Sequence, residues 1–191
     1  MTEIYLVRHG QSTWNDEHRW AGHADPPLTD LGRIQAKIAC LILKQMGFRL
    51  VTSSDLNRAK ETAAIISGEL GIELAPPVPE LKERQSGDIC GLTSQQIDTR
   101  FPGLLDQWRT GQIIEIPGGE AWSCFLERVF QGLCNLSSRP GPILVVSHEG
   151  VLRAVEHLLG EKQVRHENLE GKWIRLFNQS LLPGTRTSGV G

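Results

Sequence analysis

Two histidines in this chain of 191 residues each follow a short apolar run that reads as a buried strand. His9 comes after Arg8 at the end of residues 4–7, and His148 comes shortly after residues 143–146. Polar groups that follow parallel strands meet at the carboxyl edge of the sheet. A cation and two imidazoles at one such edge are suited to hold an anion and to transfer a phosphoryl group.

A third strand-like run, residues 50–53, is followed by another arginine. Arg58 lies about one turn into the helical pattern after Ser53-Ser54-Asp55, so its side chain can reach back to the helix start. Guanidinium groups bind phosphate oxygens in pairs and stay charged at any relevant pH. Helix N-termini also favour anions. We therefore expect both arginines to bind a phosphate dianion between the two histidines.

An unprotonated imidazole at this position can attack phosphorus. We predict that His9 is the nucleophile, with a backbone carbonyl fixing the tautomer through the other ring nitrogen. The arginines and His148 would then stabilise charge on the equatorial oxygens in the transition state. The leaving alkoxide needs a proton, for which Glu83 is the expected general acid. The same carboxylate would later activate the water that hydrolyses phosphohistidine.

Each of these residues also has an ordinary explanation when it is taken alone. The Arg8-His9 pair is compatible with a charged strand end, and His148 with a partly buried structural histidine. Their common position at the ends of strand–helix units favours a site. Metal-dependent hydrolysis is the main chemical alternative, but the chain has no H-x-x-x-H motif or close carboxylate cluster, so we expect no metal.

Composition excludes several other classes. The net charge is −2 and the hydrophobic fraction is 39%, which argue for a soluble globular protein without a global basic field for nucleic acid. The sequence shows no stretch long enough to span a membrane and no secretory signal. The four cysteines are widely separated, which favours reduced thiols and a cytoplasmic location.

Strands alternate with helical patterns, which predicts a three-layer α/β/α sandwich around a mostly parallel sheet. A late strand is expected at 173–177. Thr29 is expected to cap the first long helix, and Gly47 lies just beyond its end. Apolar residues recur at helical spacing in four segments: Leu31, Ile34, Ile38, Leu41 and Ile42; Leu56, Ala59, Ala63, Ile66 and Leu70; Trp122, Phe125, Val129, Leu133 and Leu136; Val151, Val155 and Leu158.

Residues 76–120 differ in character because they are rich in proline and glycine. We expect a loop-rich excursion with short helices at best, and long loops in compact domains often act as lids. The chain is expected to form one domain at 1–180. A flexible tail is expected at 181–191, with small polar residues after Pro183.

Six motifs in a fixed order give the chain a family resemblance. They are Leu6-Val7-Arg8-His9-Gly10-Gln11-Ser12-Thr13-Trp14-Asn15, Asp25-Pro26-Pro27-Leu28-Thr29-Asp30-Leu31-Gly32, Ser53-Ser54-Asp55-Leu56-Asn57-Arg58-Ala59-Lys60-Glu61-Thr62-Ala63, Leu81-Lys82-Glu83-Arg84, Pro117-Gly118-Gly119-Glu120 and Ser147-His148-Glu149-Gly150-Val151-Leu152-Arg153. The chain resembles the histidine phosphatase superfamily, in its phosphoglycerate-mutase-like branch 1.

The resemblance implies a phosphorylated His9 and a phosphate pocket formed by Arg8, Arg58 and His148, with Asn15 helping to line it. It implies that Glu83 donates the proton and that no cofactor or metal is needed. Possible substrate contacts are Gln11, Ser12, Gly22, Arg84 and Glu149. The expected partner is a small phosphorylated metabolite, and a homodimer is possible.

The chain departs from the family pattern at several positions. Glu149 stands where many members carry a small residue, and it would either repel very acidic substrates or point away from the pocket. Asp88-Ile89-Cys90 replaces an aromatic residue followed by glutamate, and Ala21 replaces a common glutamine. These departures affect the choice of substrate and leave the phosphotransfer residues intact.

Three functions follow from these observations. The first is a phosphatase for a small phosphomonoester, such as a phosphosugar or a phosphorylated sugar acid. The second is a phosphoglycerate-type mutase, whose known members carry a longer and more basic insertion. The third is a non-catalytic phosphate-binding protein. The basic residues of 76–120 are few, which favours the phosphatase; they are Lys82, Arg84, Arg100 and Arg109.

Overall fold

The structure is a computed structural model that describes residues 1–110 and 112–185. Six strands form one sheet in the order β3-β2-β4-β1-β5-β6. The strands are β1 (Thr2–Arg8), β2 (Leu50–Ser53), β3 (Glu73–Leu74), β4 (Ile143–Ser147), β5 (Gly171–Phe177) and β6 (Ser180–Pro183). The first four strands pair in parallel, and the last two are antiparallel. The mostly parallel sheet predicted from the sequence is therefore confirmed.

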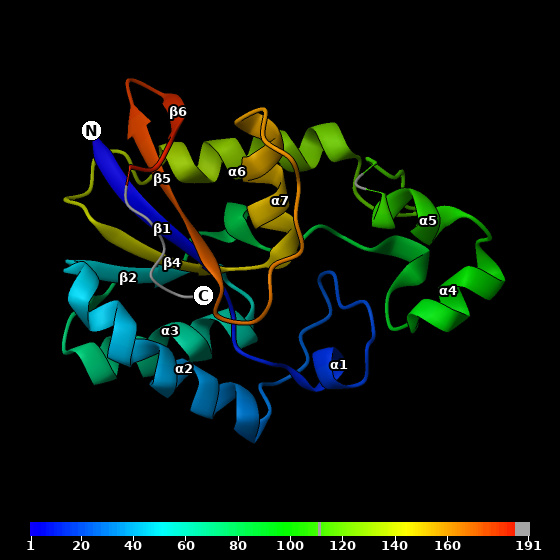
Figure 1. Ribbon diagram of the computed structural model, residues 1–191, viewed down its shortest axis with the longest axis horizontal. Coiled ribbons are helices and arrows are strands. Elements are labelled where there is room, and N and C mark those ends of the chain that lie inside the picture. The colour runs from blue at the N-terminus through cyan, green and yellow to red at the C-terminus, as the bar shows by residue number, and fades with distance from the viewer. Residues whose placement is uncertain (111, 186–191) are drawn as a thin grey trace.

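Helices cover both faces of this sheet, as Figure 1 shows. Alternate side chains of β1 explain the two interfaces, because successive residues of a strand point to opposite faces. Ile4 and Leu6 pack against α6 and α7, whereas Tyr5 and Val7 pack against α2 and α3. The long helices are α2 (Asp30–Leu43), α3 (Asn57–Leu70), α6 (Trp122–Cys134) and α7 (Glu149–Leu158). The sandwich has three layers, as predicted.

Helix α2 begins and ends where the sequence predicts. The Thr29 hydroxyl accepts a hydrogen bond from Gly32 N at 3.0 Å, which caps the first turn. A short 3-10 turn, η1 (Lys44–Met46), follows α2, and Gly47 ends it with a φ of 71°. A left-handed residue of this kind stops a helix because it turns the chain away from the axis.

The burial of α2 differs from what its apolar stripe suggests. An amphipathic helix usually turns its large apolar residues toward the core. Here the buried side of α2 carries mainly small residues, among them Ala36, Ala39 and Cys40. These let α2 pack closely against α3 and the sheet. The stripe itself faces solvent, with Leu31 50%, Ile34 51%, Ile38 58% and Leu41 73% exposed.

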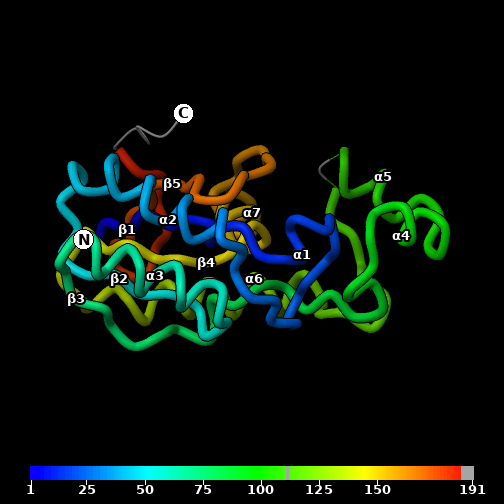
Figure 2. Tube along the Cα trace, turned by 90° about the horizontal axis from the view of Figure 1, so that it is seen from below, coloured from blue at the N-terminus to red at the C-terminus, as the bar shows by residue number. Residues whose placement is uncertain are grey.

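Residues 76–120 begin on the main core, where Val78 and Leu81 pack against α6, and then run out to one end of the sandwich, seen from below in Figure 2. Their elements are η2 (Pro79–Leu81), η3 (Gly87–Ile89), α4 (Ser94–Arg100) and α5 (Leu104–Arg109). Beyond η2, a small separate core holds this segment together, made of Ile89, Ile97, Leu105, Ile114 and Ile116. We call residues 76–120 the excursion.

The C-terminal segment needs one correction. Residues 181–183 were expected in a flexible tail, but they belong to β6, where Leu181 pairs with Leu176 of β5. The apolar residues before Gly184 let the strand extend the sheet, whereas the small polar residues come only later. Residues 186–191 lie outside the described part of the chain. Among the described residues, no helix is long and apolar enough to cross a membrane.

Candidate active site

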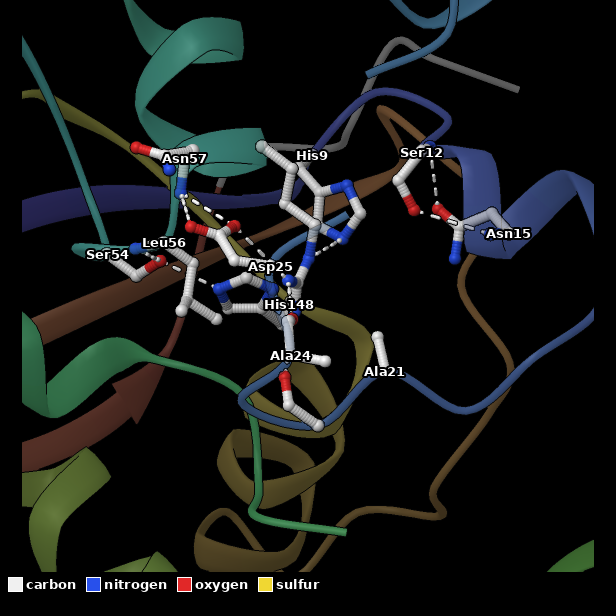
Figure 3. A network of polar contacts seen from close by, with 12 residues as sticks. His9, Ser12, Asn15, Ala21, Ala24, Asp25, Ser54, Leu56, Asn57 and His148 are labelled. Carbon is white, nitrogen blue, oxygen red and sulfur yellow. Dashed lines mark hydrogen bonds and ion pairs between the residues drawn. The ribbon is translucent and has the colours of Figure 1, made fainter. Parts of the chain in front are cut away.

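Three neighbouring strands end at the same edge of the sheet. Strands β2, β4 and β1 lie side by side in register, with Ser53 beside Val146 and Arg8 beside Ser147. The residues that follow them therefore converge. His9 is 4% exposed and His148 is 0% exposed, and their ring centroids lie 5.1 Å apart. Figure 3 shows the two rings close together, with Ser54 beside His148.

The contacts of His9 fix its tautomer. Its Nδ1 lies 2.7 Å from Gly10 O, and its Nε2 accepts a hydrogen bond from Arg58 Nε at 3.1 Å. Because an arginine always donates, Nε2 must carry the lone pair and Nδ1 the hydrogen. Burial, followed by the charges of Arg58 and Arg8, holds the pKa of His9 well below 6.5. The imidazole is neutral near pH 7, with Nε2 ready to attack.

His148 is anchored by a serine that the sequence argument placed at the strand end but did not assign a role. Ser54 Oγ lies 2.7 Å from His148 Nε2, and Leu56 N donates to the same hydroxyl at 3.4 Å. Burial and then the charge of Arg58 lower the pKa of His148 well below 6.5. Within the described residues, His148 Nδ1 has no hydrogen-bond partner. That buried nitrogen is the one left for a ligand.

Arg58 is held by backbone carbonyls rather than by carboxylates. Its Nη1 donates to Ala24 O at 2.7 Å and its Nη2 donates to Gly22 O at 3.0 Å. Asp25 lies farther away, at 3.7 Å from Nη1, and its carboxylate accepts from Asn57 N at the start of α3 (Figure 3). The guanidinium is thus oriented toward His9 while its positive charge is only weakly compensated.

Arg8 is positioned from the opposite side. Its Nη1 donates to His166 O at 2.6 Å and lies 3.2 Å from Glu149 Oε2. The Glu149 carboxylate therefore points toward the site rather than away from it. Burial raises its pKa, and the charge of Arg8 opposes that rise. Within the described part of the chain, Arg8 Nε has no hydrogen-bond partner, which leaves it available to an anion.

Asn15 lies at the mouth of the site on the short helix α1 (Thr13–Asp16). Its Oδ1 accepts from Ser12 N at 3.1 Å and from Asn168 Nδ2 at 3.3 Å, and Asn168 also donates to His9 O at 2.8 Å. Ser12 is fully buried, and its hydroxyl accepts from Asn15 N as the helix cap. The Ser12 hydroxyl thus caps its own helix (Figure 3), and Ser12 is not among the residues that line the cavity described below.

Glu83 reaches the site from the excursion. Its two carboxylate oxygens accept hydrogen bonds from Arg84 N at 2.8 Å and from Gly150 N at 3.2 Å. Gly150 stands in the first turn of α7, and a Cβ added there would lie 2.0 Å from Glu83 Oε1. The carboxylate therefore packs directly against the helix start, where only glycine leaves enough room.

An arginine on α6 fixes the backbone that carries Glu83. Arg128 donates to the carbonyls of Glu80, Lys82 and Glu83 at 2.7–2.8 Å. It also makes a two-bond ion pair with Glu120, at 2.6 and 2.8 Å. Sequence patterns gave no signal for Arg128, because its partners are backbone atoms more than 40 residues away in the chain. Glu120 stands in the Pro-Gly-Gly-Glu motif, but sequence reasoning assigned it no role.

Arg8, His9, Asn15, Arg58 and Glu83 line a cavity of about 1370 Å³ between the sheet edge and the excursion. The expected contacts Gln11, Gly22, Arg84 and Glu149 all lie on its wall. Part of the wall is aromatic, formed by Trp14, Trp20, Trp108 and Trp122. Among the described residues, no three His, Cys, Asp or Glu side chains gather in a way that would hold a metal ion.

Comparison with known proteins finds phosphatases and phosphoglycerate mutases among the relatives of this chain. Residues 4–174 match the model of the histidine phosphatase superfamily (branch 1). A 2,3-bisphosphoglycerate-dependent phosphoglycerate mutase of Xanthobacter autotrophicus is 37% identical, over 80% of this chain and 78% of that protein. A metal-independent phosphoserine phosphatase of Arabidopsis thaliana is 36% identical, over 81% of this chain and 67% of that protein. A mycobacterial glucosyl-3-phosphoglycerate phosphatase, solved with VO3, superimposes with a TM-score of 0.81 at 28% identity, covering 91% of this chain and 90% of that one.

Proposed function

This chain belongs to branch 1 of the histidine phosphatase superfamily, and we propose that it hydrolyses a small phosphomonoester through a phosphohistidine intermediate. One observation carries the proposal. His9 is buried and neutral, and its Nε2 carries the lone pair, which accepts a hydrogen bond from Arg58 Nε in the free protein. A nucleophile in this state needs no activating base. The proposal requires no metal or organic cofactor.

In the first step, Nε2 of His9 forms a bond to phosphorus while the bond from phosphorus to the substrate oxygen breaks. The leaving alkoxide takes a proton from the carboxyl group of Glu83. Arg58 Nε, which donates to Nε2 in the free protein, turns its hydrogen bond to a phosphoryl oxygen. His9 Nδ1 keeps its hydrogen and continues to donate it to Gly10 O, and this hydrogen bond stabilises the charged phosphoimidazole.

In the second step, Glu83 takes a proton from water as the water oxygen bonds to phosphorus. The bond from phosphorus to His9 Nε2 breaks, and inorganic phosphate leaves. Glu83 ends this step protonated, as it began the first, so protons balance over the cycle.

The remaining groups stabilise the three equatorial oxygens. Arg8 Nε and the Arg58 guanidinium supply positive charge. The Ser54 hydroxyl can donate to His148 Nε2, which places a hydrogen on the unpartnered Nδ1 of that ring. His148 then acts as a neutral hydrogen-bond donor to phosphate. Fixed donors of this kind commonly lower a barrier by about 3 kcal/mol each.

The substrate we propose is a phosphosugar, a phosphorylated sugar acid or a similar metabolite. The cavity of about 1370 Å³ exceeds the space that a phosphoryl group needs, which leaves room for a leaving group the size of a small metabolite. The relatives named for phosphoserine and for glucosyl-3-phosphoglycerate act on phosphate esters of acidic metabolites.

The four free cysteines support a reducing compartment such as the cytoplasm.

The charges of the excursion favour hydrolysis over a mutase reaction. A mutase must hold a carboxylate and a second phosphate while the intermediate turns over. Here Arg109 is paired with Asp98 and Asp106, and Lys82 is paired with Asp55. Within the described residues, these cations are already partnered, and Arg84 donates to the carbonyls of Glu120 and Ile114.

A mutase stays the second candidate because a relative at 37% identity carries that name. Incubation with 3-phosphoglycerate and a bisphosphate primer separates the two. Release of free phosphate supports the phosphatase, whereas isomerised product with little free phosphate supports the mutase.

The decisive test is to trap the intermediate. Purified protein quenched during turnover of p-nitrophenyl phosphate should carry an acid-labile, base-stable phosphoryl group on His9. His9→Asn should abolish both the adduct and turnover, with a loss of at least about 10⁴-fold. His157→Asn, at an exposed histidine on α7, is the matched control and should change neither. Near-normal turnover by His9→Asn would refute the mechanism, and a purified protein that hydrolysed no phosphomonoester would favour the non-catalytic alternative.

A further inference from the structure

The exposed face of α2 carries large apolar residues that the packing of this helix in the fold does not require. Leu31, Ile34, Ile38 and Leu41 are each at least half exposed and lie on one stripe. The opposite side of α2 already packs against α3 and the sheet. Contiguous apolar surface on a soluble protein commonly marks an interaction site.

The spacing of the stripe is that of a coiled-coil seam. The four residues follow at intervals of three, four and three, which are the a and d positions of a heptad pattern. A seam this narrow fits another helix better than it fits a broad flat surface. The stripe therefore indicates a helical partner.

The stripe is also palindromic about position 36. If a second α2 lies antiparallel across it, Leu31 meets Leu41 of the partner and Ile34 meets Ile38 of the partner. Each leucine then faces a leucine and each isoleucine faces an isoleucine. A surface that is complementary to itself in this way is what a two-fold symmetric interface requires.

The flanking charges agree with this arrangement. In the antiparallel register, Asp30 near the start of one helix lies beside Lys44 at the end of the other, and the pair occurs twice by symmetry. Both side chains are exposed, and Asp30 also pairs with Arg33 on its own helix at 3.0 Å, so the contact with Lys44 would extend that pair. In a parallel arrangement each would face its own copy and repel it. Lys37 lies near the two-fold axis beside its own copy, so it weakens the association that the other charges favour.

We propose that two copies of this chain associate through α2, antiparallel about a two-fold axis that passes near position 36. The seam runs from Leu31 to Leu41, ten helical steps or about 15 Å, which places the interface at the small end of the range for specific complexes. We expect a reversible dimer that forms at micromolar concentrations. This inference concerns a surface apart from the cavity and holds whatever the substrate is.

Sedimentation equilibrium over a range of concentrations tests the dimer. The unmodified chain should show a monomer–dimer equilibrium, and Ile38→Lys should raise the dissociation constant at least about 100-fold, because two isoleucines are lost from each dimer. The matched control is Phe177→Lys, at an apolar side chain of β5 that is also half exposed. It should leave the equilibrium unchanged. Phosphatase activity of all three proteins serves as the check on folding.

Charge variants test the orientation. Asp30→Lys or Lys44→Glu alone should weaken the dimer by about two- to fivefold, and the two together should restore it. Lys37→Gln should tighten the dimer by a similar factor, which a merely structural effect would not do. A monomer at all concentrations would overturn the proposal. A dimer lost in Phe177→Lys but kept in Ile38→Lys would also overturn it, since the interface would then lie at the β5–β6 edge.

Discussion

The two walls of the cavity are built in different ways. At the sheet edge, the reacting groups are buried, and their hydrogen bonds go largely to backbone atoms, as Gly10 O and Gly22 O show for His9 and Arg58. On the excursion side, Ile89, Ile97, Leu105, Ile114 and Ile116 form a small core apart from the sheet. Arg109, a cation of this segment that lines the cavity, is exposed and is held by exposed carboxylates.

This difference assigns the reaction to the sheet edge and the choice of substrate to the excursion. Removing one member of a buried hydrogen-bonded set leaves its partner unsatisfied, at a cost of about 1–3 kcal/mol, whereas an exposed ion pair contributes about 0–1 kcal/mol. The sheet edge therefore holds one geometry. The excursion can change its side chains, and so the leaving group it accepts, with little loss of stability.

The strongest test of the comparison is to remove Arg58. Arg58→Ala should lower kcat/KM about 10³-fold for every phosphomonoester, because the phosphoryl group common to all of them loses its main cation. Steady-state kinetics on an aryl and an alkyl phosphate measure the effect. Losses that differed widely between the two substrates would mean that Arg58 contacts the leaving group instead.

Glu83 lies on the excursion but acts at the sheet edge. Its variant therefore tests whether a residue of the excursion takes part in the reaction. Glu83→Gln should slow alkyl phosphates about 10²-fold or more, because a poor leaving group needs the proton. It should slow p-nitrophenyl phosphate much less, since nitrophenolate leaves without one. Equal losses for both substrates would argue that Glu83 is not the general acid.

The sequence predicted the site residues at the sheet edge far more fully than the contacts of the excursion. Short apolar strands, the Thr29 cap and Gly47 are local signals, so the sandwich and the positions of His9 and His148 followed from the sequence. Arg128 was missed because it binds distant carbonyls, which leave no mark in a sequence pattern.

The burial of α2 was missed for a related reason. Periodicity identifies an apolar stripe but not what covers it. Small residues such as Ala36 and Ala39 pack this helix against the fold, and Leu41 is left facing solvent. The roles of Ser12 and Ser54 likewise depend on which partner each hydroxyl meets after folding.

The buried, neutral histidines also predict a pH effect on stability. The pKa values of His9 and His148 lie well below 6.5 in the folded protein. Below about pH 6.5 the unfolded chain therefore binds protons that the folded chain does not, and the free energy of unfolding falls as the pH drops. Each histidine contributes up to about 1.4 kcal/mol per pH unit in that range.

Urea unfolding of the wild type and His9→Asn across this range measures that slope. The variant should lose stability less steeply as the pH falls, by the share of one histidine. His157→Asn, at an exposed position, should keep the wild-type slope. Identical slopes in His9→Asn and the wild type would mean that His9 is protonated in the folded protein, which would contradict the tautomer derived from Arg58.

A smaller effect is expected where the two walls touch. Gly150→Ala places a Cβ 2.0 Å from Glu83 Oε1, and the carboxylate must move because it is the flexible partner. We expect about a tenfold fall in kcat for alkyl phosphates, with p-nitrophenyl phosphate less affected, as for Glu83→Gln. Thermal unfolding should change little, since alanine suits a helix better than glycine. A large loss of stability with equal losses on both substrates would assign Gly150 to packing alone.

The smallest effect should come from the excursion itself. Arg109→Ala removes a cation that lines the cavity and two exposed ion pairs, to Asp98 and Asp106. We expect unfolding to change by less than about 1 kcal/mol and kcat on p-nitrophenyl phosphate to change by less than about threefold. Any larger change should appear in KM and only for substrates with an acidic leaving group, because only those offer a negative charge to the Arg109 guanidinium. A uniform loss on all substrates, comparable with that of Arg58→Ala, would show that the excursion takes part in the reaction and that the two walls are not separate.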